Sequence, residues 1–273
     1  MTNKVAVVTG AGGVLCGAFA EELGGMGAKV ALLDLNEQAA ETVAARIRAA
    51  GGTAKAYKAN VLEPEDLRAV HEKVLADLGK CDLLINGAGG NNPKATTDKE
   101  VYETGDIDAD VKSFFDLDAA GIGFVFDLNF LGTLLPTQVF AADMLGRGGN
   151  IINMSSMNAF TPLTKIPAYS GAKAAVSNFT EWLAVHFARQ NIRVNAIAPG
   201  FFVTNQNKAL LFKEDGSPTP RTDKILAATP MKRFGEPEEL LGVLRFLADD
   251  TQSGFITGTV IPVDGGFHAY SGV

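Results

Sequence analysis

The chain has 273 residues, of which 47% are hydrophobic and 20% are charged, and its formal net charge is −7 at pH 7. A chain of this length can bury a substantial core, and its ordinary hydrophobic content excludes a disordered protein. The acidic balance argues against nucleic acid and anionic membranes as partners, because both attract basic surfaces.

Short apolar runs alternate along the chain with longer segments of helical period. In chain order, we predict a strand over 4–9, a helix over 14–26, a strand over 29–34, a helix over 37–50, a strand over 53–60, a helix from Pro64 and a strand over 81–86. The second half continues with a helix over 124–145, a strand over 150–154, a helix over 168–190, a strand over 192–198, a helix over 237–249 and a strand over 257–263. Gly132 and Pro136 should kink or interrupt the helix that contains them.

This alternation predicts an α/β fold, because parallel strands need crossover connections and helices then cover both faces of the sheet. No linker, repeat or low-complexity tract divides the sequence, so we expect one domain over residues 1–273. Two long segments, 91–123 and 201–235, are predicted to be irregular. Both follow the carboxyl ends of strands, where open α/β sheets bind ligands, so we expect them to form the walls of a substrate site.

Several classes of site and location are disfavoured by the sequence. Two cysteines, Cys16 and Cys81, are too few for a disulfide framework, which predicts reduced thiols and a cytoplasmic location. No uninterrupted apolar stretch reaches the length of a membrane span. The three histidines show no metal-ligand spacing, and the acidic stretch 106–117 lacks the Gly and Glu of an EF-hand loop. We therefore expect no metal site and no membrane partner.

A glycine-rich turn, Thr9-Gly10-Ala11-Gly12-Gly13, lies between the first strand and the first helix. Glycines at such a turn let the backbone approach a pyrophosphate and direct helix N-terminal amides at it. Asp34 ends the second strand about 20 residues further on, where a carboxylate binds a ribose 2′-hydroxyl. The alternative role of Asp34 is to cap the next helix. No Lys or Arg adjoins Asp34 to hold a 2′-phosphate, so we expect NAD rather than NADP as the cofactor.

Tyr169 and Lys173 are one helical turn apart within the predicted helix 168–190, so their side chains emerge on one face. A nearby ammonium stabilises a phenolate. Lys173 and the positive nicotinamide ring should therefore lower the pKa of Tyr169 from its usual value of about 10. Tyr169 can then exchange a proton with an alcohol oxygen while a hydride leaves or joins the carbon. These residue types point to an oxidoreductase.

Taken in order, the motifs of this chain resemble those of the short-chain dehydrogenase/reductase family over essentially the whole length. They are Thr9-Gly10 with its glycines, Asn86-Gly87-Ala88-Gly89, Asn129, Ser156, Tyr169-x-x-x-Lys173, Pro199-Gly200 with Thr204, and Asp264-Gly265-Gly266. The resemblance implies a Rossmann-type doubly wound parallel sheet and a homotetramer or homodimer. It also implies that Ser156 hydrogen-bonds the reacting oxygen, that Lys173 holds the nicotinamide ribose, and that Asn129 holds a water in a proton relay.

Two motifs depart from the family pattern. Val14 and Cys16 occupy the last two glycine positions of the first turn, and Gly87 replaces the second Asn of an Asn-Asn-Ala-Gly motif. Asn60 stands where the family usually has an Asp near the adenine. The cofactor-binding residues implied by the resemblance are Gly10, Gly13, Val14, Leu15, Asp34, Leu35, Asn60, Val61, Asn86, Gly87, Ala88, Tyr169, Lys173, Phe202 and Thr204.

The segments 158–169, 199–206 and 91–126 resemble the subgroup of D-mannonate oxidoreductase, also called fructuronate reductase, which interconverts D-fructuronate and D-mannonate with NADH or NAD. Their polar residues suit a polyhydroxylated acid, although we expect half of them to stabilise loops instead. The candidate substrate residues are Asn91, Ser156, Asn158, Gln206 and Arg221, with Asn92 and Asn205 beside them. Lys165 is the alternative to Arg221 as the partner of a substrate carboxylate.

Other functions stay open at this point. The chain could be a gluconate-type sugar-acid dehydrogenase or a sugar-alcohol dehydrogenase of the same family, which a panel of substrates would separate. It could also be a non-catalytic Rossmann protein that senses NAD, which NADH oxidation would exclude. An acyl-carrier-linked reductase would need a basic docking patch, and the sequence gives little sign of one.

Overall fold

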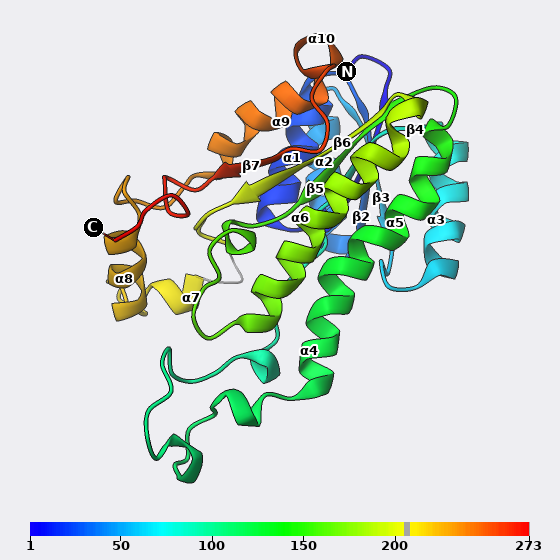
Figure 1. Cartoon of the computed structure of the whole chain (residues 1–273). Helices are drawn as coiled ribbons and strands as arrows, with labels where there is room; N and C mark the ends of the chain where they lie inside the picture. The colour runs from blue at the N-terminus through cyan, green and yellow to red at the C-terminus, as the bar shows by residue number, and fades with distance from the viewer. Residues whose placement is uncertain (205–207, 273) are drawn as a thin grey trace.

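A seven-stranded parallel sheet forms the centre of the computed structural model, which describes residues 1–204 and 208–272 (Figure 1). The strands are β1 Val5–Thr9, β2 Lys29–Asp34, β3 Thr53–Lys58, β4 Cys81–Asn86, β5 Gly149–Met154, β6 Ile192–Pro199 and β7 Val260–Val263. They lie in the order β3-β2-β1-β4-β5-β6-β7, and every neighbouring pair is parallel. The strand order reverses between β1 and β4, the kind of position at which doubly wound sheets bind ligands.

Helices cover both faces of the sheet because successive strand side chains point to opposite faces. Ala6 of β1 belongs to one buried cluster and Val7 to the other. The first cluster includes residues of α1 Val14–Gly25, α2 Glu37–Ala49 and α9 Leu241–Ala248, and the second includes residues of α3 Pro64–Asp77, α5 Gly132–Phe140 and α6 Pro167–Phe187. Phe19 and Phe140, one in each cluster, are fully buried, and such burial contributes about 1.5–3 kcal/mol per side chain. The predicted α/β sheet is confirmed.

Most predicted elements agree with the observed ones to within two residues, and the exceptions are the last strand and the helix predicted over 124–145. The predicted strand 257–263 starts only at Val260, because Gly258 has a φ of +79°, which is incompatible with an extended strand. The predicted strand 53–60 ends at Lys58. A short helix, α10 Asp250–Ser253, separates α9 from β7.

The predicted helix 124–145 is longer than expected and is continuous. It starts at Ala119, because the Asp118 carboxylate caps it by accepting a hydrogen bond from a first-turn backbone N–H (2.6 Å). It runs through α4 Ala119–Phe126, a π-helical turn Asp127–Leu131 and α5, and it ends in a 3₁₀ turn, Ala141–Met144. Gly132 and Pro136 therefore do not interrupt the helix; the irregular π turn precedes them both.

This helix over residues 119–144 is also long and apolar enough to cross a membrane, judged by its length and composition alone. A core helix of a globular protein passes the same test, and Phe140 and Met144 near its end are fully buried in the core. Asp127 and Asn129 interrupt its apolar sequence.

Two long segments extend from the carboxyl-terminal edge of the sheet. Residues 91–118, which we call the arm, project away from the sheet at the bottom of Figure 1 and contain short 3₁₀ turns. Residues 201–235, which we call the 201–235 segment, are not wholly irregular as predicted, because they include α7 Lys208–Leu211 and α8 Pro220–Ala228. α8 begins where Thr219 caps its N-terminus and Pro220 occupies its first turn.

Candidate active site

The glycine turn between β1 and α1 forms a cradle that side chains would fill. Gly10 has a φ of +66°, and a Cβ on it would lie 2.9 Å from the Gly87 carbonyl oxygen. A Cβ on Gly12 would lie 2.7 Å from the Ala39 Cβ. Gly13 is the N-cap of α1 and provides no side-chain cap, so the first-turn amides of this helix suit an anion such as a pyrophosphate. The residues of this turn fit a dinucleotide.

Asp34 holds the same turn from the end of β2. Its carboxylate accepts hydrogen bonds from the backbone N–H groups of Gly12 (2.9 Å) and Asn36 (2.8 Å). Asn36 is the cap of α2, because its Oδ1 accepts a hydrogen bond from the Ala39 N–H (3.2 Å). The alternative role of Asp34 as the helix cap is therefore wrong. Its carboxylate borders the cradle, where a ribose hydroxyl would need an acceptor.

The other predicted cofactor residues lie at the same edge of the sheet, because parallel strands bring their carboxyl ends together. Val14 and Leu15 start α1, Leu35 follows β2, Asn60 and Val61 follow β3, Gly87 and Ala88 follow β4, and Phe202 and Thr204 follow β6. Asn86 is the exception among them. Its side chain points into the interior, where its amide donates hydrogen bonds to Thr137 and Asn153, both 2.9 Å long.

The two departures from the family pattern are in contact with each other. A Cβ on Gly87 would overlap Cys16 Sγ and would lie 2.8 Å from the Thr9 carbonyl oxygen. Burial raises the pKa of the Cys16 thiol to about 12, so the group that fills this space is neutral. Cys16 occupies volume that a side chain at position 87 would need, and the two departures compensate each other.

Tyr169 and Lys173 lie one turn apart on α6, beside the end of β5 that is followed by Ser156. The Ser156 side chain lies beside Tyr169 and acts to lower the pKa of its phenol, and Lys173 Nζ lies 5.7 Å from the centroid of the Tyr169 ring. Lys173 Nζ also donates a hydrogen bond to the Met154 carbonyl oxygen (2.8 Å), which ties α6 to β5. The structure thus brings these three predicted catalytic residues together.

Asn129 completes the group from the π turn, where it is fully buried. Its Nδ2 donates hydrogen bonds to the carbonyl oxygens of Gly90 (2.8 Å) and Val125 (2.7 Å). A Cβ on Gly89 would lie 2.7 Å from Asn129 Oδ1 and 3.2 Å from Lys173 Nζ. Asn129 and Lys173 therefore meet at the backbone of Gly89, and only a glycine fits between them.

Burial controls the pKa values of the two titratable residues of this group. Burial raises the pKa of Tyr169, and the hydrogen bond from Ser156 opposes this rise only in part. Burial also lowers the pKa of Lys173 to about 8. The expectation that Lys173 lowers the pKa of Tyr169 is therefore wrong for the protein groups alone, because desolvation of the phenolate has the larger effect.

The predicted substrate residues lie in different environments. Asn158 is buried next to Ser156, and its backbone N–H donates a hydrogen bond to Ser156 Oγ (3.2 Å). Asn91 instead stabilises the arm, because its side chain donates a hydrogen bond to the Thr96 hydroxyl (3.0 Å). Gln206, together with its neighbour at position 205, lies outside the described residues.

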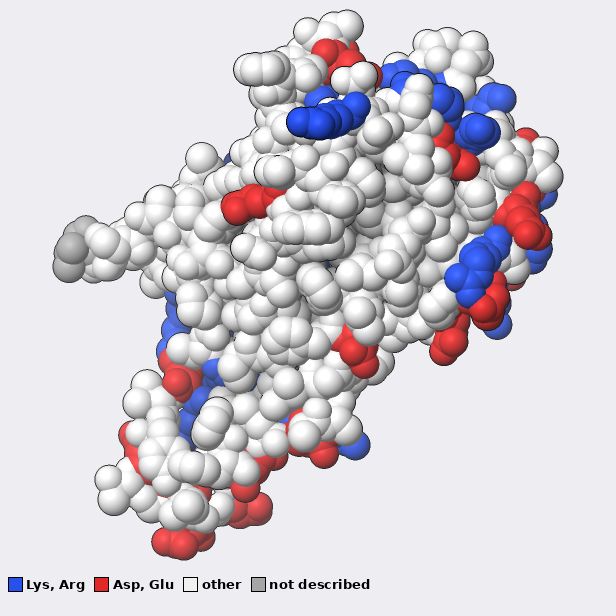
Figure 2. Space-filling view, turned by 45° about the vertical axis from the view of Figure 1, so that its right-hand side comes forward, with Lys and Arg blue, Asp and Glu red and all other residues white. Residues whose placement is uncertain are grey.

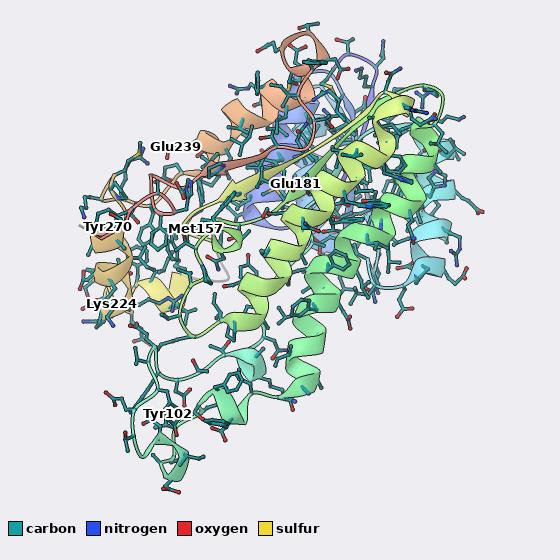
Figure 3. All side chains as sticks on the ribbon, in the orientation of Figure 1. Tyr102, Met157, Glu181, Lys224, Glu239 and Tyr270 are labelled. Atoms are coloured by element: carbon teal, nitrogen blue, oxygen red, sulfur yellow. The ribbon has the colours of Figure 1, made fainter. Side chains whose placement is uncertain are left out.

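Basic residues gather where the arm meets the 201–235 segment. Lys165, which has a φ of +71°, donates a hydrogen bond from Nζ to the Asp98 carbonyl oxygen of the arm (2.6 Å). Lys224 of α8 donates to the Glu100 carboxylate (3.0 Å), and Figure 3 shows Lys224 on the side of α8 toward the arm. Lys224 lowers the pKa of Glu100 most, and Lys165 and Arg221 add to this effect. The carboxylate of Glu100 thus faces three cations.

One contact near Ser156 is missed by the sequence argument. Asp264 accepts hydrogen bonds from Nδ1 (2.7 Å) and the backbone N–H (2.9 Å) of His268. The His268 ring packs on Phe160, in the loop after Ser156, with 5.2 Å between the ring centroids. The four-residue spacing between Asp264 and His268 is the only sequence signal, and the contact with Phe160 joins distant parts of the chain.

Within residues 1–204 and 208–272, no group of three or more His, Cys, Asp or Glu side chains is placed to hold a metal ion. The acidic stretch of the arm uses its carboxylates internally, as Asp106 does in its ion pair with Lys99 (2.6 Å). Cys16 and Cys81 are both buried free thiols.

Known proteins are similar to this chain over its whole length. Residues 13–268 match the family model described as enoyl-(acyl carrier protein) reductase. The Bacillus subtilis protein described as uncharacterized oxidoreductase UxuB is 54% identical over 100% of this chain and 98% of its own. A crystal structure from Haemophilus influenzae, provisionally described as a D-mannonate oxidoreductase with bound NAD, is 63% identical, covers 100% of this chain and 98% of that one, and has a TM-score of 0.96.

A more distant crystal structure, of a gluconate 5-dehydrogenase from Burkholderia cenocepacia with NADP and tartrate, is 30% identical. It covers 98% of this chain and 96% of that one, with a TM-score of 0.83. These similarities agree with the parallel sheet and the helices around it. The chain is an oxidoreductase that belongs to the short-chain dehydrogenase/reductase family.

Proposed function

We propose that this chain is an NAD(H)-dependent oxidoreductase that interconverts a ketone and a secondary alcohol on a sugar acid, with D-fructuronate and D-mannonate as its substrates. The grouping of Ser156, Tyr169 and Lys173 supports the reaction class. The observation that carries the substrate is the 63% identity to the Haemophilus structure provisionally described as a D-mannonate oxidoreductase.

Bound NADH would supply a hydride to the carbonyl carbon of the ketone. Tyr169 donates its phenolic proton to the carbonyl oxygen, so the hydride forms the new C–H bond and the proton completes the alcohol. Burial raises the pKa of Tyr169 and so keeps it protonated at neutral pH, as a proton donor must be. Ser156, which lies beside Tyr169 and opposes the rise in its pKa, would hold the reacting oxygen there.

Lys173 and Asn129 support this proton transfer. Lys173 has a pKa of about 8, so it can return a proton to Tyr169 and regain one from solvent near neutral pH. Its side chain would also hold the nicotinamide ribose. Asn129, buried and hydrogen-bonded to the backbone, would hold a water that links Lys173 to solvent. In the oxidation direction, each of these proton movements is reversed.

Asp34 supports NAD as the cofactor instead of NADP. Its carboxylate is fixed by the N–H groups of Gly12 and Asn36, at the border of the glycine cradle. A carboxylate in this place accepts hydrogen bonds from a ribose 2′-hydroxyl and repels a 2′-phosphate.

Arg221 is our candidate for the substrate carboxylate, because burying an unpaired carboxylate would cost several kcal/mol. Lys165 and Lys224 already bond to the arm. Arg221 lies about one turn before Lys224, and its planar guanidinium can hold a carboxylate with two hydrogen bonds.

A panel of NADH-coupled reductions tests the substrate, and the panel contains D-fructuronate, 5-keto-D-gluconate and neutral ketoses. We expect D-fructuronate to be the best substrate and neutral ketoses to be poor ones. Arg221→Met should raise the KM for D-fructuronate about tenfold, as expected for loss of a charged hydrogen bond, and should leave NADH binding unchanged. Lys213→Met, a charge removal on the same loop, is the matched control. If neutral ketoses react as well as D-fructuronate, the sugar-acid proposal fails and the family assignment stands.

The same panel tests the alternatives. The structural similarity to a gluconate 5-dehydrogenase with NADP and tartrate favours a gluconate-type activity as the second candidate. Faster reduction of 5-keto-D-gluconate than of D-fructuronate would support it. A non-catalytic NAD-sensing protein would bind NADH without oxidising it, whatever the substrate.

We also propose that the chain forms a homodimer or homotetramer and acts in the cytoplasm, where its free thiols persist. The exposed large apolar residues of α4, the π turn and α6 are Phe124, Phe126, Leu131, Trp182 and Val185. Figure 2 shows few charged side chains at the centre of the face on which these helices lie. Sedimentation equilibrium would test the proposal, and a monomer at micromolar concentration would contradict it.

A further inference from the structure

A series of buried hydrogen bonds, which we call the line, connects Asn129 along its helix to the middle of the sheet. The Thr133 hydroxyl donates to the Asn129 carbonyl oxygen (2.8 Å), and the Thr137 hydroxyl donates to the Thr133 carbonyl oxygen (2.7 Å). Thr137 Oγ1 in turn accepts a hydrogen bond from Asn86 Nδ2 at the end of β4 (2.9 Å). The two threonine hydroxyls thus bond to carbonyl oxygens of their own helix, and Thr137 Oγ1 also links that helix to Asn86.

The same line continues across the sheet to the helix that carries Tyr169. Asn86 Nδ2 also donates to Asn153 Oδ1 on β5, and Asn153 Nδ2 donates to Thr180 Oγ1 on α6, both at 2.9 Å. The Thr180 hydroxyl donates to the Val176 carbonyl oxygen (2.8 Å). The side chains of the line, Asn86, Thr133, Thr137, Asn153 and Thr180, belong to residues that are at most 3% exposed.

The residues after Asn153 tie β5 to α6 at the catalytic end. The Met154 carbonyl oxygen accepts the hydrogen bond from Lys173 Nζ, and the hydroxyls of Ser155 and Ser177 are hydrogen-bonded to each other (2.7 Å). The helix with Tyr169 and Lys173 is thus held on β5 by three successive residues. The line of hydrogen bonds connects this unit to the π turn with Asn129.

Burying the polar side chains of this line in the core is energetically demanding. An unpaired buried polar group costs about 1–3 kcal/mol, so the rotamers along the line are constrained to those that pair most of its groups. Asn86 Oδ1 is the one buried side-chain atom of the line that has no hydrogen-bond partner among the described residues. A π turn is a rare conformation that needs support from its surroundings. Thr133 and Thr137 give this support just after the turn, and the sheet anchors Thr137 through Asn86.

We propose that Thr137 is a positioning residue that couples Asn129 to the Tyr169–Lys173 unit through this buried line. Thr137 touches neither the cofactor cradle nor the reacting atoms. Its hydroxyl joins the helix of the π turn to Asn86, and through Asn153 to α6. The line keeps Asn129 at the distance from Lys173 that the proton relay requires.

The first test removes the hydroxyl and keeps the shape. Thr137→Val should lower kcat for NADH-coupled reduction of D-fructuronate about tenfold, while the dissociation constant for NADH, measured by fluorescence, stays within twofold. Thr137→Ser keeps the hydroxyl and should keep kcat within twofold. Thr42→Val is the matched control, because the Thr42 hydroxyl makes the same type of bond, to the Gln38 carbonyl oxygen, on the exposed surface of α2.

A double variant separates positioning from general stability. If Thr137 acts through Asn129, then Asn129→Ala combined with Thr137→Val should have the kcat of Asn129→Ala alone. Multiplying effects would overturn the proposal, as would a Thr137→Val variant whose melting temperature falls while its kcat stays within twofold of the unmutated enzyme. Thr133→Val, which removes the neighbouring bond to the Asn129 carbonyl, should give the same tenfold loss and replaces Thr137→Val if that variant does not fold.

Amide hydrogen exchange gives a readout that does not depend on the substrate. Thr137→Val should speed exchange in residues 127–133 and not in α2, and Thr42→Val should leave residues 127–133 unchanged. Unchanged exchange in residues 127–133 of Thr137→Val would overturn the proposal. Because this readout needs no turnover, failure of the D-fructuronate assignment is distinguishable from failure of the positioning role.

Discussion

The group of predicted catalytic residues and the two long segments predicted to form the walls of a substrate site differ in how they are held. Asn129, Lys173 and Ser156 are 0%, 5% and 7% exposed, and their hydrogen bonds run to backbone and core groups. On the arm, Phe114 and Phe115 are 68% and 66% exposed; their rings meet edge to face, and Phe115 also contacts Tyr102 in the same way. Figure 2 shows acidic side chains gathered at the end of the arm. The predicted catalytic residues thus lie in the buried part of the molecule, and the segments predicted to select a substrate lie outside it.

The walls are joined by contacts that contribute little free energy. The ion pair between Lys224 and Glu100 is exposed to solvent, and exposed pairs typically contribute about 0–1 kcal/mol. The buried bonds of the centre are more costly to break, because each leaves an unpaired group in a medium of low dielectric constant. A change in the centre should therefore abolish activity, whereas a change in the walls should alter substrate preference.

The largest effect is expected at Tyr169. Tyr169→Phe keeps the ring and removes the transferable proton, so kcat should fall roughly a hundredfold or more while NADH binding changes little. Lys173→Ala should lower kcat and also weaken NADH binding, because Lys173 is proposed to hold the nicotinamide ribose and to exchange protons with Tyr169. Steady-state kinetics and NADH fluorescence titration measure the two quantities. A Tyr169→Phe enzyme with near-normal kcat would refute the catalytic assignment.

The next effect concerns the tight packing behind the cofactor cradle. Gly87→Asn forces a side chain into the volume of Cys16, and overpacking of this kind costs about 1–3 kcal/mol of unfolding free energy. Adding Cys16→Gly should restore part of that stability, which urea unfolding measures. Gly123→Asn on α4 is the control, because a Cβ there meets nothing within 4 Å. Additive losses in the double variant would show that the two positions are independent.

A smaller effect is expected at the adenosine end of the cradle. Asp34→Ala removes the repulsion of a 2′-phosphate, so the ratio of kcat/KM with NADH to that with NADPH should fall about tenfold. Asp110→Ala, a charge removal on the arm, should leave the ratio unchanged. If the unmutated enzyme uses both cofactors with equal efficiency, the role given to Asp34 is wrong.

The smallest effect is expected where the walls meet. Glu100→Gln should lower the free energy of unfolding by less than about 1 kcal/mol and change the KM for D-fructuronate about twofold, and both effects should vanish at high salt. Arg68→Gln removes an exposed ion pair on α3, away from the arm, and should leave the KM for D-fructuronate unchanged. A loss of several kcal/mol in Glu100→Gln would contradict the contrast between rigid centre and weakly held walls.

Local patterns in the sequence predicted much of the fold and the order of the catalytic residues. The periods of strands and helices depend on residues that are close in sequence. The strand–helix–strand order around Gly10 and Asp34 is therefore predictable without tertiary information. Tyr169 and Lys173 share a helix face for the same reason. The caps at Asp118 and Thr219 were missed, so the start of α4 and the whole of α8 were read as irregular.

The sequence by itself determined the parallel sheet, the cradle after β1 and the residues proposed to carry out proton transfer, because each rests on short-range spacing. Only the tertiary structure decided which distant residues touch. The contact of Cys16 with Gly87, the hydrogen bond of Asn86 with Thr137 and the rise in the Tyr169 pKa all depend on burial and on crossings between strands and helices. Burial is a property of the packed molecule, and no local pattern specifies which group it will surround.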